Sequence, residues 1–244
     1  MNTLDAGPVL LTCGDHHGSR ALAALPTVIL PSCPGRADLD PVLTELTARR
    51  LVVAGTDADL AAVLVRLLRR ERLDVEVAYL PRGRSAAARA WGLPRNAEAL
   101  ALDGVAAPVP LVRDDSGGVL VGRAEARLRG EVYCDETLVL RGAGRVVVEA
   151  GPRGVGVRAS RTGRAPDGRT RAVPPRAPAG RGSAVGRAVQ LGGEPFTPVL
   201  DGVPHPRAVT RWAWYRHTAD WLLVRPTPAQ AGASRRFRDG ESSL

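Results

Sequence analysis

The fold is decided by the stretch Leu51-Val52-Val53-Ala54-Gly55-Thr56-Asp57-Ala58-Asp59-Leu60, in which four apolar residues lead into a glycine and two aspartates. The apolar run predicts a buried strand that ends at Gly55, and residues 57–70 carry an apolar stripe at helical spacing. Asp57 is placed to cap that helix, and backbone N–H groups at such a turn can hold a phosphate. A strand–glycine–helix turn is usually only a capped turn, so this stretch alone predicts structure and not function.

The segments on either side of this stretch repeat the same alternation. Short apolar runs that end in Gly or Pro predict further strands, and apolar residues at helical spacing predict further helices. The predicted strands are 9–12, 27–30 and 75–80, and the predicted helices are 39–49 and 85–91. Because strands that alternate with helices form parallel sheets covered by helices, we expect residues 1–105 to be an α/β domain of nucleotide-binding type.

The pattern changes after residue 104. Strand-like segments follow one another without a helical pattern between them, separated by turns that contain Gly, Pro or Asp. These segments are 109–112, 119–121, 131–134, 145–149, 184–191, 197–200, 209–215 and 221–224. We expect residues 106–226 to form an antiparallel β-sandwich domain, with a hinge near 104–110. Few apolar residues occur at 158–183 or 227–244, which predicts a disordered loop and a disordered tail.

Two later segments have comparable turn residues. The first is Leu80-Pro81-Arg82-Gly83-Arg84-Ser85, where a strand ends in Pro-x-Gly before a short helix that Gly92-Leu93-Pro94 closes. The second is Val199-Leu200-Asp201-Gly202-Val203-Pro204, in which Asp-Gly is a strong hairpin turn. Each segment has a purely structural interpretation, the first as a strand-to-helix loop and the second as a hairpin.

Taken in this order, the three segments resemble the catalytic domain of the diacylglycerol kinase family, over residues 51–226. That family has a Gly-Gly-Asp-Gly-Thr loop after a strand, a later Pro-x-Gly-Thr-x-Asn-Asp loop, and an Asp-Gly-Glu turn in its β domain. The resemblance implies the NAD kinase/diacylglycerol kinase-like fold, with ATP and Mg²⁺ as cofactors if the protein is active. It implies that Asp57 and Asp201 are catalytic and that Asp57 and Asp59 bind the metal. The implied nucleotide-binding residues are Gly55, Thr56, Asp59, Gly83, Arg84 and Ser85.

The chain departs from the family pattern in each motif. Thr56 and Ala58 replace glycines of the first loop, and a Cβ at these positions restricts close backbone approach to a triphosphate. Asp59 replaces the threonine and adds negative charge where phosphates would lie. The second loop lacks Asn-Asp, and Val203 replaces the glutamate implicated in catalysis. Because valine neither binds a metal nor accepts a proton, we expect weak or no phosphotransfer.

Composition restricts the other classes of function. All 34 basic residues are arginine, which excludes a P-loop lysine and a Schiff-base lysine. The net charge is +9, but seven arginines and one aspartate lie within 158–183, so no specific nucleic-acid partner is expected. The three cysteines follow no disulfide spacing, and no apolar run reaches the roughly 20 residues of a membrane span, so we expect a cytoplasmic protein. Cys13, His16, His17 and Cys33 match no established zinc-finger spacing.

Three functions remain open. The first is a kinase-like protein with eroded motifs that retains a nucleotide- or phosphate-binding cleft between residues 55–59, residues 83–85 and Asp201. The second is an active ATP-dependent kinase that phosphorylates a lipid or small-molecule hydroxyl. The third is a polyanion- or membrane-binding module that uses loop 158–183 in weak contact with anionic membranes. The expected partners are a nucleotide and, for the kinase, a lipid, whereas the oligomeric state stays open.

Overall fold

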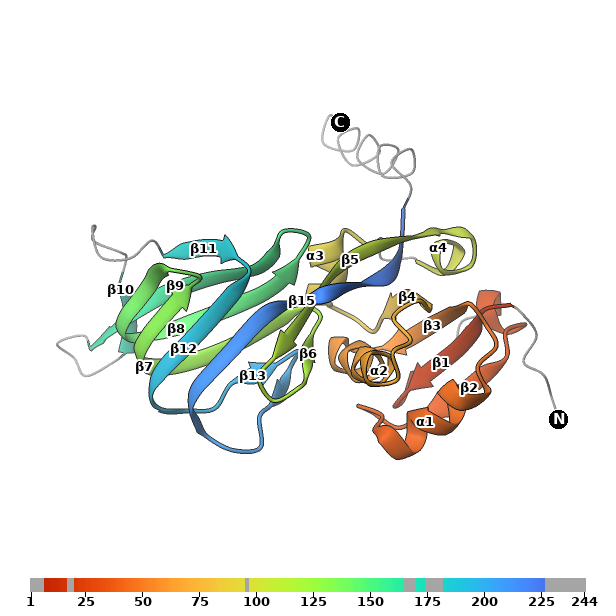
Figure 1. Ribbon diagram of the computed structural model, residues 1–244, viewed down its shortest axis with the longest axis horizontal. Coiled ribbons are helices and arrows are strands. Elements are labelled where there is room, and N and C mark those ends of the chain that lie inside the picture. Colours follow the sequence, from red (N-terminus) through yellow and green to blue (C-terminus); the bar gives the residue numbers. More distant parts are fainter. Residues whose placement is uncertain (1–6, 17–19, 95–96, 165–169, 174–181, 227–244) are drawn as a thin grey trace.

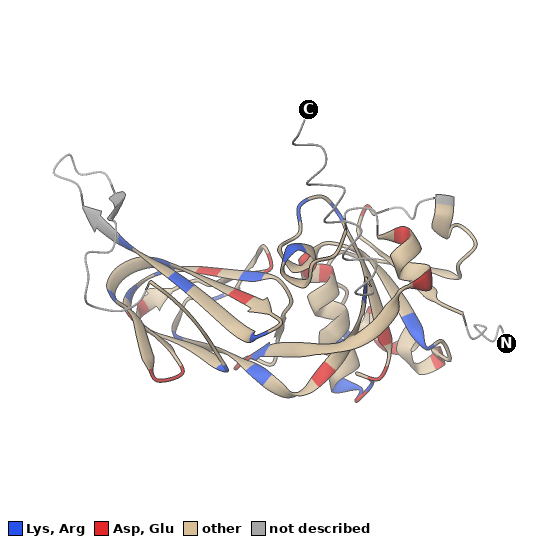
Figure 2. Cartoon of the chain, turned by 90° about the horizontal axis from the view of Figure 1, so that it is seen from above, with Lys and Arg blue, Asp and Glu red and all other residues tan. Residues whose placement is uncertain are grey.

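A computed structural model describes the chain except for residues 1–6, 17–19, 95–96, 165–169, 174–181 and 227–244. The described strands form one mixed β-sheet, and the helices group around one half of the molecule (Figure 1). The strand order is β10-β9-β8-β7-β12-β15-β4-β3-β1-β2, with β5 and the short strands β6, β11, β13 and β14 paired off this path. Seen from above, the molecule is elongated, and its antiparallel half extends away from the helices (Figure 2).

The first half is a parallel sheet with helices in its connections. Its strands are β1 (Val9–Cys13), β2 (Thr27–Leu30), β3 (Arg50–Gly55) and β4 (Glu76–Pro81). Its helices are η1 (Arg20–Leu22, a 3-10 helix), α1 (Arg36–Glu45), α2 (Asp57–Arg69), α3 (Ala86–Trp91) and α4 (Glu98–Asp103). β1 pairs in parallel with β2 and β3, and β3 pairs in parallel with β4. The predicted parallel α/β arrangement is confirmed.

Helix α2 is built as its apolar stripe predicts. Leu60, Val63, Leu64 and Leu67 are all fully buried, because residues three and four apart share one helix face. Arg70 follows as the C-cap, and its backbone N–H donates to the carbonyl groups of the last turn. The predicted helix and the observed one therefore agree to within one residue, and α2 leads from the Gly55 turn into the body of the protein.

The sequence pattern does not predict helix α4, because its C-terminal end depends on a distant residue. The Arg50 guanidinium on β3 donates to the carbonyl oxygens of Ala101 (3.0 Å), Leu102 (2.6 Å) and Gly104 (2.8 Å). It also forms an ion pair with Glu76 on β4 at 2.7 Å. Carbonyl groups at a helix C-terminus lack partners within the helix, so Arg50 satisfies groups that would otherwise be unpaired.

The second half is antiparallel. Its strands are β5 (Val105–Asp114), β6 (Val119–Leu120), β7 (Arg123–Cys134), β8 (Thr137–Gly151), β9 (Gly154–Arg164), β10 (Thr170–Val173), β11 (Ser183–Gly186), β12 (Ala188–Phe196), β13 (Val199–Leu200), β14 (Val203–Pro204) and β15 (Val209–Arg225). β15 pairs antiparallel with β12 and β5, and its residues Leu222 and Leu223 pair in parallel with β4. This single long strand therefore joins the two halves, where the sequence predicts two separate strands.

The predicted antiparallel half is confirmed, but its strands belong to one continuous sheet with the first half. β5 passes close to β8 and β9, which are not its hydrogen-bonding neighbours, so the sheet curls over its own core. Trp214 and Trp221 of β15 are fully buried in that core. β5 begins at Val105 and runs through the segment 104–110, so the proposed hinge there and the division into domains at 105/106 remain predictions.

Part of the segment 158–183, which the sequence predicts as a disordered loop, is assigned to strands. β9 continues to Arg164, and β10 pairs with it in antiparallel register. Val155 and Val157 are buried and Arg158 is exposed, which is the alternation of a strand with one core face. The ladder between β9 and β8 extends this strand beyond its apolar residues. Residues 165–169 and 174–181, and the predicted tail 227–244, lie outside the described residues.

All three cysteines lie within the described residues. Cys13, Cys33 and Cys134 are free thiols. Among the described residues, which do not include His17, no group of three His, Cys, Asp or Glu side chains is arranged to hold a metal ion. No helix within the described ranges is long and apolar enough to cross a membrane.

Candidate functional site

The turn between β3 and α2 is closed by a capping box. The Asp59 backbone N–H donates to Thr56 Oγ1 (3.3 Å), and Asp59 Oδ2 accepts from the Thr56 backbone N–H (2.7 Å) and hydroxyl (2.8 Å). Asp59 Oδ1 accepts from the Cys33 backbone N–H at 2.6 Å. A Cβ on Gly55 would lie 2.6 Å from Asp59 Oδ2, so this position must be glycine. Asp59 is buried and serves to hold the turn.

Asp57 connects the start of α2 to the start of α3. Its Oδ1 accepts hydrogen bonds from the hydroxyl groups of Tyr79 (2.9 Å) and Ser85 (2.5 Å). Its Oδ2 accepts from the backbone N–H groups of Ala86 (2.8 Å) and Ala87 (3.2 Å). Burial, and then the Asp57 carboxylate, raise the pKa of Tyr79 well above its ordinary value, so its hydroxyl stays a donor. The four lone-pair positions of the Asp57 carboxylate are therefore all used by protein donors.

Asp201 lies in the hairpin turn between β13 and β14. Asp201 and Gly202 have φ values of 48° and 92°, as a primed hairpin turn requires, and the predicted Asp-Gly hairpin is confirmed. The Asp201 carboxylate accepts from the backbone N–H groups of Val121 (3.0 Å), Gly122 (2.9 Å) and Arg123 (2.8 Å). Burial raises the pKa of Asp201 to about 7; the three N–H donors oppose this rise, and the Asp57 charge adds to it.

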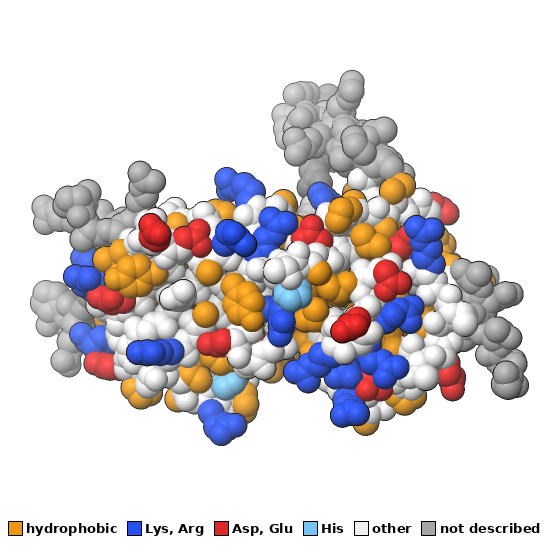
Figure 3. Space-filling view, viewed as in Figure 1, with side chains coloured by type: hydrophobic (Ala, Val, Ile, Leu, Met, Phe, Trp, Pro, Cys, Tyr) orange, Lys and Arg blue, Asp and Glu red, His pale blue; other side chains and the backbone are white. Residues whose placement is uncertain are grey.

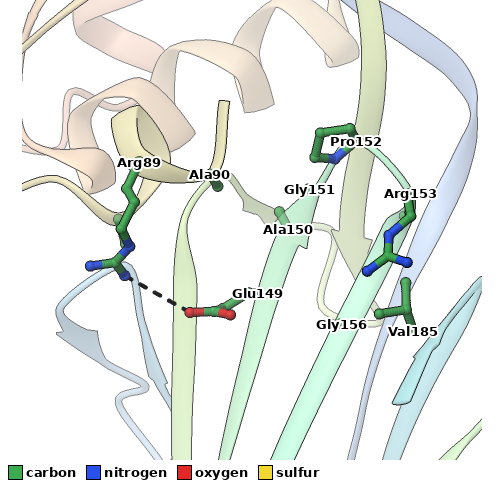
Figure 4. A pocket seen from close by; sticks show the side chains of 11 residues that line it. Arg89, Ala90, Glu149, Ala150, Gly151, Pro152, Arg153, Gly156 and Val185 are labelled. Carbon is green, nitrogen blue, oxygen red and sulfur yellow. Dashed lines mark ion pairs between the residues drawn. The ribbon is translucent and has the colours of Figure 1, made fainter. Parts of the chain in front are cut away.

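The two aspartates face a cavity of about 400 Å³. It is lined by Asp57, Arg84, Ser85, Ala86, Arg89, Arg123, Glu125, Val199, Asp201 and Gly202. A larger cavity of about 1080 Å³ adjoins it and shares Arg84, Ser85 and Arg89. A third cavity, of about 210 Å³, lies between α3 and the β8–β9 hairpin and again includes Arg89 (Figure 4). The Arg89 side chain thus borders three adjoining cavities.

Three arginines and three acids line this cavity, and the arginines differ in how firmly they are paired. Glu125 forms ion pairs with Arg123 and Arg145, and the hydrogen bond from Arg145 is the main reason that its pKa is lowered. Arg89 lies 3.9 Å from Glu149, a separation too long for a hydrogen bond (Figure 4). Arg84 is exposed and has no hydrogen-bond or ion-pair partner among the described residues. The cavity is therefore bordered by one arginine without a partner among the described residues, Arg84, and by one in a long ion pair, Arg89.

The structure brings together part of the site that the sequence predicts. Asp57, Arg84, Ser85 and Asp201 line the same cavity, and Gly83 lines the adjoining one. The structure does not place the other predicted nucleotide-binding residues, Gly55, Thr56 and Asp59, at the wall of either cavity. For Asp59 the physical reason is its enclosure in the capping box, which could not be foreseen because its third donor comes from the distant Cys33 backbone.

Sequence reasoning misses three residues of the site. Arg89 follows the Ser85 cap by four positions, so its helical spacing could have placed it on the same side of α3. The sequence around Tyr79 predicts an ordinary buried strand residue, and no sequence feature indicates its hydrogen bond to Asp57. Arg123 begins β7 and comes to the cavity only because Asp201 binds the backbone at this point.

The residues present do not fit a Mg²⁺ site of the kind that the family resemblance implies. Asp57 and Asp59, the two predicted ligands, share no hydrogen-bond partner, and each is engaged by different parts of the chain. A cation at either carboxylate would have to displace backbone or hydroxyl donors that close the turns. The arginines, in contrast, fit the phosphate groups of a nucleotide, because guanidinium groups bind phosphate oxygens in a matching fork geometry.

No family model and no curated protein matches the amino-acid sequence. Solved structures do match the fold. Two structures of a provisionally identified diacylglycerol kinase from Bacillus anthracis str. Sterne give TM-scores of 0.63 and 0.62 at 13% identity, and cover 92% of this chain and 98% of theirs. An NAD kinase from Archaeoglobus fulgidus in complex with ATP gives a TM-score of 0.50 at 11% identity, and covers 95% of this chain and 98% of its own.

Proposed function

We propose, from the premise that this chain has the NAD kinase/diacylglycerol kinase-like fold, that it binds a nucleotide or another phosphate-bearing ligand and performs weak or no phosphotransfer. One observation supports this most directly. Asp57 and Asp201, two of the three acids of the cavity, accept hydrogen bonds from protein donors, while Arg84 beside them is unpaired among the described residues and Arg89 forms only a long ion pair with Glu149. The site is therefore prepared to hold an anion rather than to activate a hydroxyl group.

Phosphoryl transfer depends on positioning and on stabilising charge, and three of the groups it needs are compromised here. The first is the backbone cradle, where Thr56 closes a capping box with its side chain. The second is the metal, because both predicted ligands are engaged. The third is the proton acceptor, where Val203 stands on β14 with 45% of its surface exposed. Loss of one such element typically costs about 10²- to 10⁴-fold in rate.

One observation favours the active kinase as a second candidate. The pKa of Asp201 is raised to about 7, and a general base works best when its pKa lies near the operating pH. Asp201 borders the cavity that also contains Asp57 and Arg84. In this alternative, Asp201 would take the proton of a lipid or small-molecule hydroxyl as that hydroxyl attacks the terminal phosphate of ATP, and the bond from that phosphate to ADP would break.

Calorimetric titration with ADP and ATP, with and without Mg²⁺, tests the proposal. We expect binding that Mg²⁺ changes little and that the double variant Arg84→Ala/Arg89→Ala weakens by about tenfold or more, the effect of losing charge-assisted hydrogen bonds. Arg82→Ala is the matched control, because Arg82 lies in the same loop but lines neither cavity. Absence of nucleotide binding by the wild type would refute the proposal. Mg²⁺-dependent phosphotransfer that Asp57→Ala abolishes would favour the active kinase.

A further inference from the structure

Two arginine side chains from different halves of the molecule converge on the turn between β5 and β6. Arg69 is the last residue of α2, and Arg113 lies on β5. Their Nη2 atoms would lie 3.4 Å and 3.9 Å from a Cβ placed on Gly117, which has a φ of +84°. The guanidinium groups therefore approach the same point, which only the absence of a side chain at Gly117 leaves open.

No acidic side chain of the described residues forms an ion pair with either arginine, although Asp114 and Asp115 lie in the same turn. Among the residues that the structure describes, no carboxylate oxygen lies within 4.0 Å of either guanidinium. The nearby Asp114 is committed to its own turn, because its Oδ1 accepts from the Ser116 N–H (2.9 Å), the Ser116 hydroxyl (2.6 Å) and the Gly118 N–H (2.8 Å). Arg113 Nε is buried and has no hydrogen-bond partner in the described structure.

This arrangement is unfavourable for a protein without a ligand. Arg69 is exposed, so solvent screens part of its repulsion with Arg113, but a buried donor without a partner, such as Arg113 Nε, costs about 1–3 kcal/mol. The negative end of the α2 dipole stabilises Arg69 at the C-terminus of the helix, but it does not explain why Arg113 points to the same place. The Arg113 charge also acts on His217, whose pKa is lowered first by burial and then by that charge.

We infer that Arg69 and Arg113 form a second anion site, which takes a phosphate-type dianion at the Gly117 turn. A tetrahedral oxyanion with two negative charges matches two guanidinium groups and can accept from several of their N–H donors at once. Figure 3 shows arginine side chains gathered on this face, over α2 and beside β6. Two arginines close to Arg69 in the sequence have partners: Arg66 pairs with Asp40, and Arg70 donates to Thr44. Arg69 has no such partner among the described residues and can bind the anion.

The second site is separate from the candidate cavity. Helix α2 has Thr56 and Asp57 at its start, where the cavity lies, and Arg69 at its end. Thirteen residues at 1.5 Å each place the two sites roughly 20 Å apart. The ligand would contact α2 of the parallel half and β5 of the antiparallel half together, so binding would stabilise the packing of one half on the other. The inference does not depend on the proposed nucleotide site.

Inorganic phosphate is the probe. Its binding is followed by ³¹P line broadening and by the rise in Tm, against sodium chloride at equal ionic strength. We expect Arg69→Ala to weaken phosphate binding by about tenfold or more, while the neighbouring exposed variant Arg70→Ala keeps wild-type affinity. Arg113→Gln is a second variant, which removes the charge, retains polar contacts at a half-buried position, and should also weaken phosphate binding. The Arg84→Ala/Arg89→Ala double variant should bind phosphate at this site as the wild type does, which distinguishes this site from the candidate cavity.

The source of the phosphate group is settled by a second arm with phosphatidylcholine vesicles that contain phosphatidate. Vesicle binding that requires Arg69, with no effect of free phosphate, would assign the site to a lipid headgroup. Binding of free phosphate that requires Arg69 would assign it to a soluble phosphate or phosphomonoester. The inference is wrong if neither probe distinguishes Arg69→Ala from the wild type, or if chloride raises Tm as much as phosphate does.

Discussion

Asp57 and Asp201 face each other across Gly122: a Cβ on that glycine would lie 2.8 Å from Asp57 Oδ2 and 3.0 Å from Asp201 Oδ1. The two carboxylates come from opposite halves of the chain, and each is held by backbone N–H groups of another element. Asp57 is bound by the start of α3, and Asp201 by the segment that leads into β7. Two acids this close are tolerated because directed donors stabilise their charges.

The first prediction concerns this contact. Gly122→Ala places a methyl group 2.7 Å from the Ala87 backbone nitrogen, as well as against both carboxylates, and backbone cannot move aside easily. We expect it to lower the free energy of unfolding by about 2 kcal/mol, typical of overpacking. Gly192→Ala is the control, because a Cβ there meets nothing within 4 Å. Urea denaturation of both variants measures the difference, and equal stability of the two would contradict the packing described.

The second prediction is a pH dependence of stability that originates in Asp201. Its pKa rises from 3.8 to about 7 on folding, so between these values the native state binds more protons than the unfolded state. The free energy of unfolding should then decrease as pH rises from about 4 to about 7, by up to about 4 kcal/mol from this residue. Below pH 4 both states are protonated, and this contribution is fully present.

Asp201→Asn isolates that contribution, because asparagine does not titrate. The variant should give a flatter profile of unfolding free energy against pH than the wild type between pH 4 and 7, whatever its absolute stability. Asp74→Asn changes an exposed carboxyl, 71% accessible, and serves as the control that should keep the wild-type slope. A wild-type slope in Asp201→Asn would show that this carboxyl is ionised throughout the range.

The third prediction compares two neighbouring arginines that share one partner. Arg50 and Arg49 both pair with Glu76, at 2.7 Å and 3.0 Å, but their side chains are 14% and 83% exposed. Arg50→Ala also removes the donors to the α4 carbonyl groups and should cost about 3 kcal/mol of stability. Arg49→Ala should cost less than about 1 kcal/mol, as exposed ion pairs do. Thermal unfolding of the two variants is the measurement, and similar Tm values would contradict the capping role of Arg50.

Local sequence signals predict the parts of the fold whose causes are local. The strand Thr27–Leu30 is found within the predicted bounds, and the hairpin at Asp201 follows from the backbone preferences of its turn residues. The cavity that Asp57, Ser85 and Asp201 share is expected only from the family resemblance of three motifs, because it joins residues far apart in the chain. The strand and the hairpin, in contrast, need only neighbouring residues to be specified.

The features that escape prediction have distant causes. Helix α4 needs the Arg50 guanidinium, which comes from β3. The central part of β15 lacks an apolar pattern and is a strand because β5 supplies its ladder on both sides of a register shift between Arg216 and Asp220. The family resemblance assigns Asp59 to the metal, but the distant Cys33 backbone N–H donates to its carboxylate. Tertiary partners decide these cases, as they often override local propensity.

The last prediction tests whether one residue accounts for the eroded chemistry. Val203→Glu restores the acid of the Asp-Gly-Glu turn that this chain resembles, and at 45% exposure the new side chain should change stability by less than about 0.5 kcal/mol. We expect no recovery of phosphate transfer from ATP to diacylglycerol, measured with radiolabelled ATP, because Asp57 stays bound by Tyr79, Ser85 and the start of α3. Those donors belong to the folded framework and do not depend on residue 203. Robust turnover by Val203→Glu would instead show that Asp57 can be released to a metal, and that the valine alone had silenced an otherwise competent site.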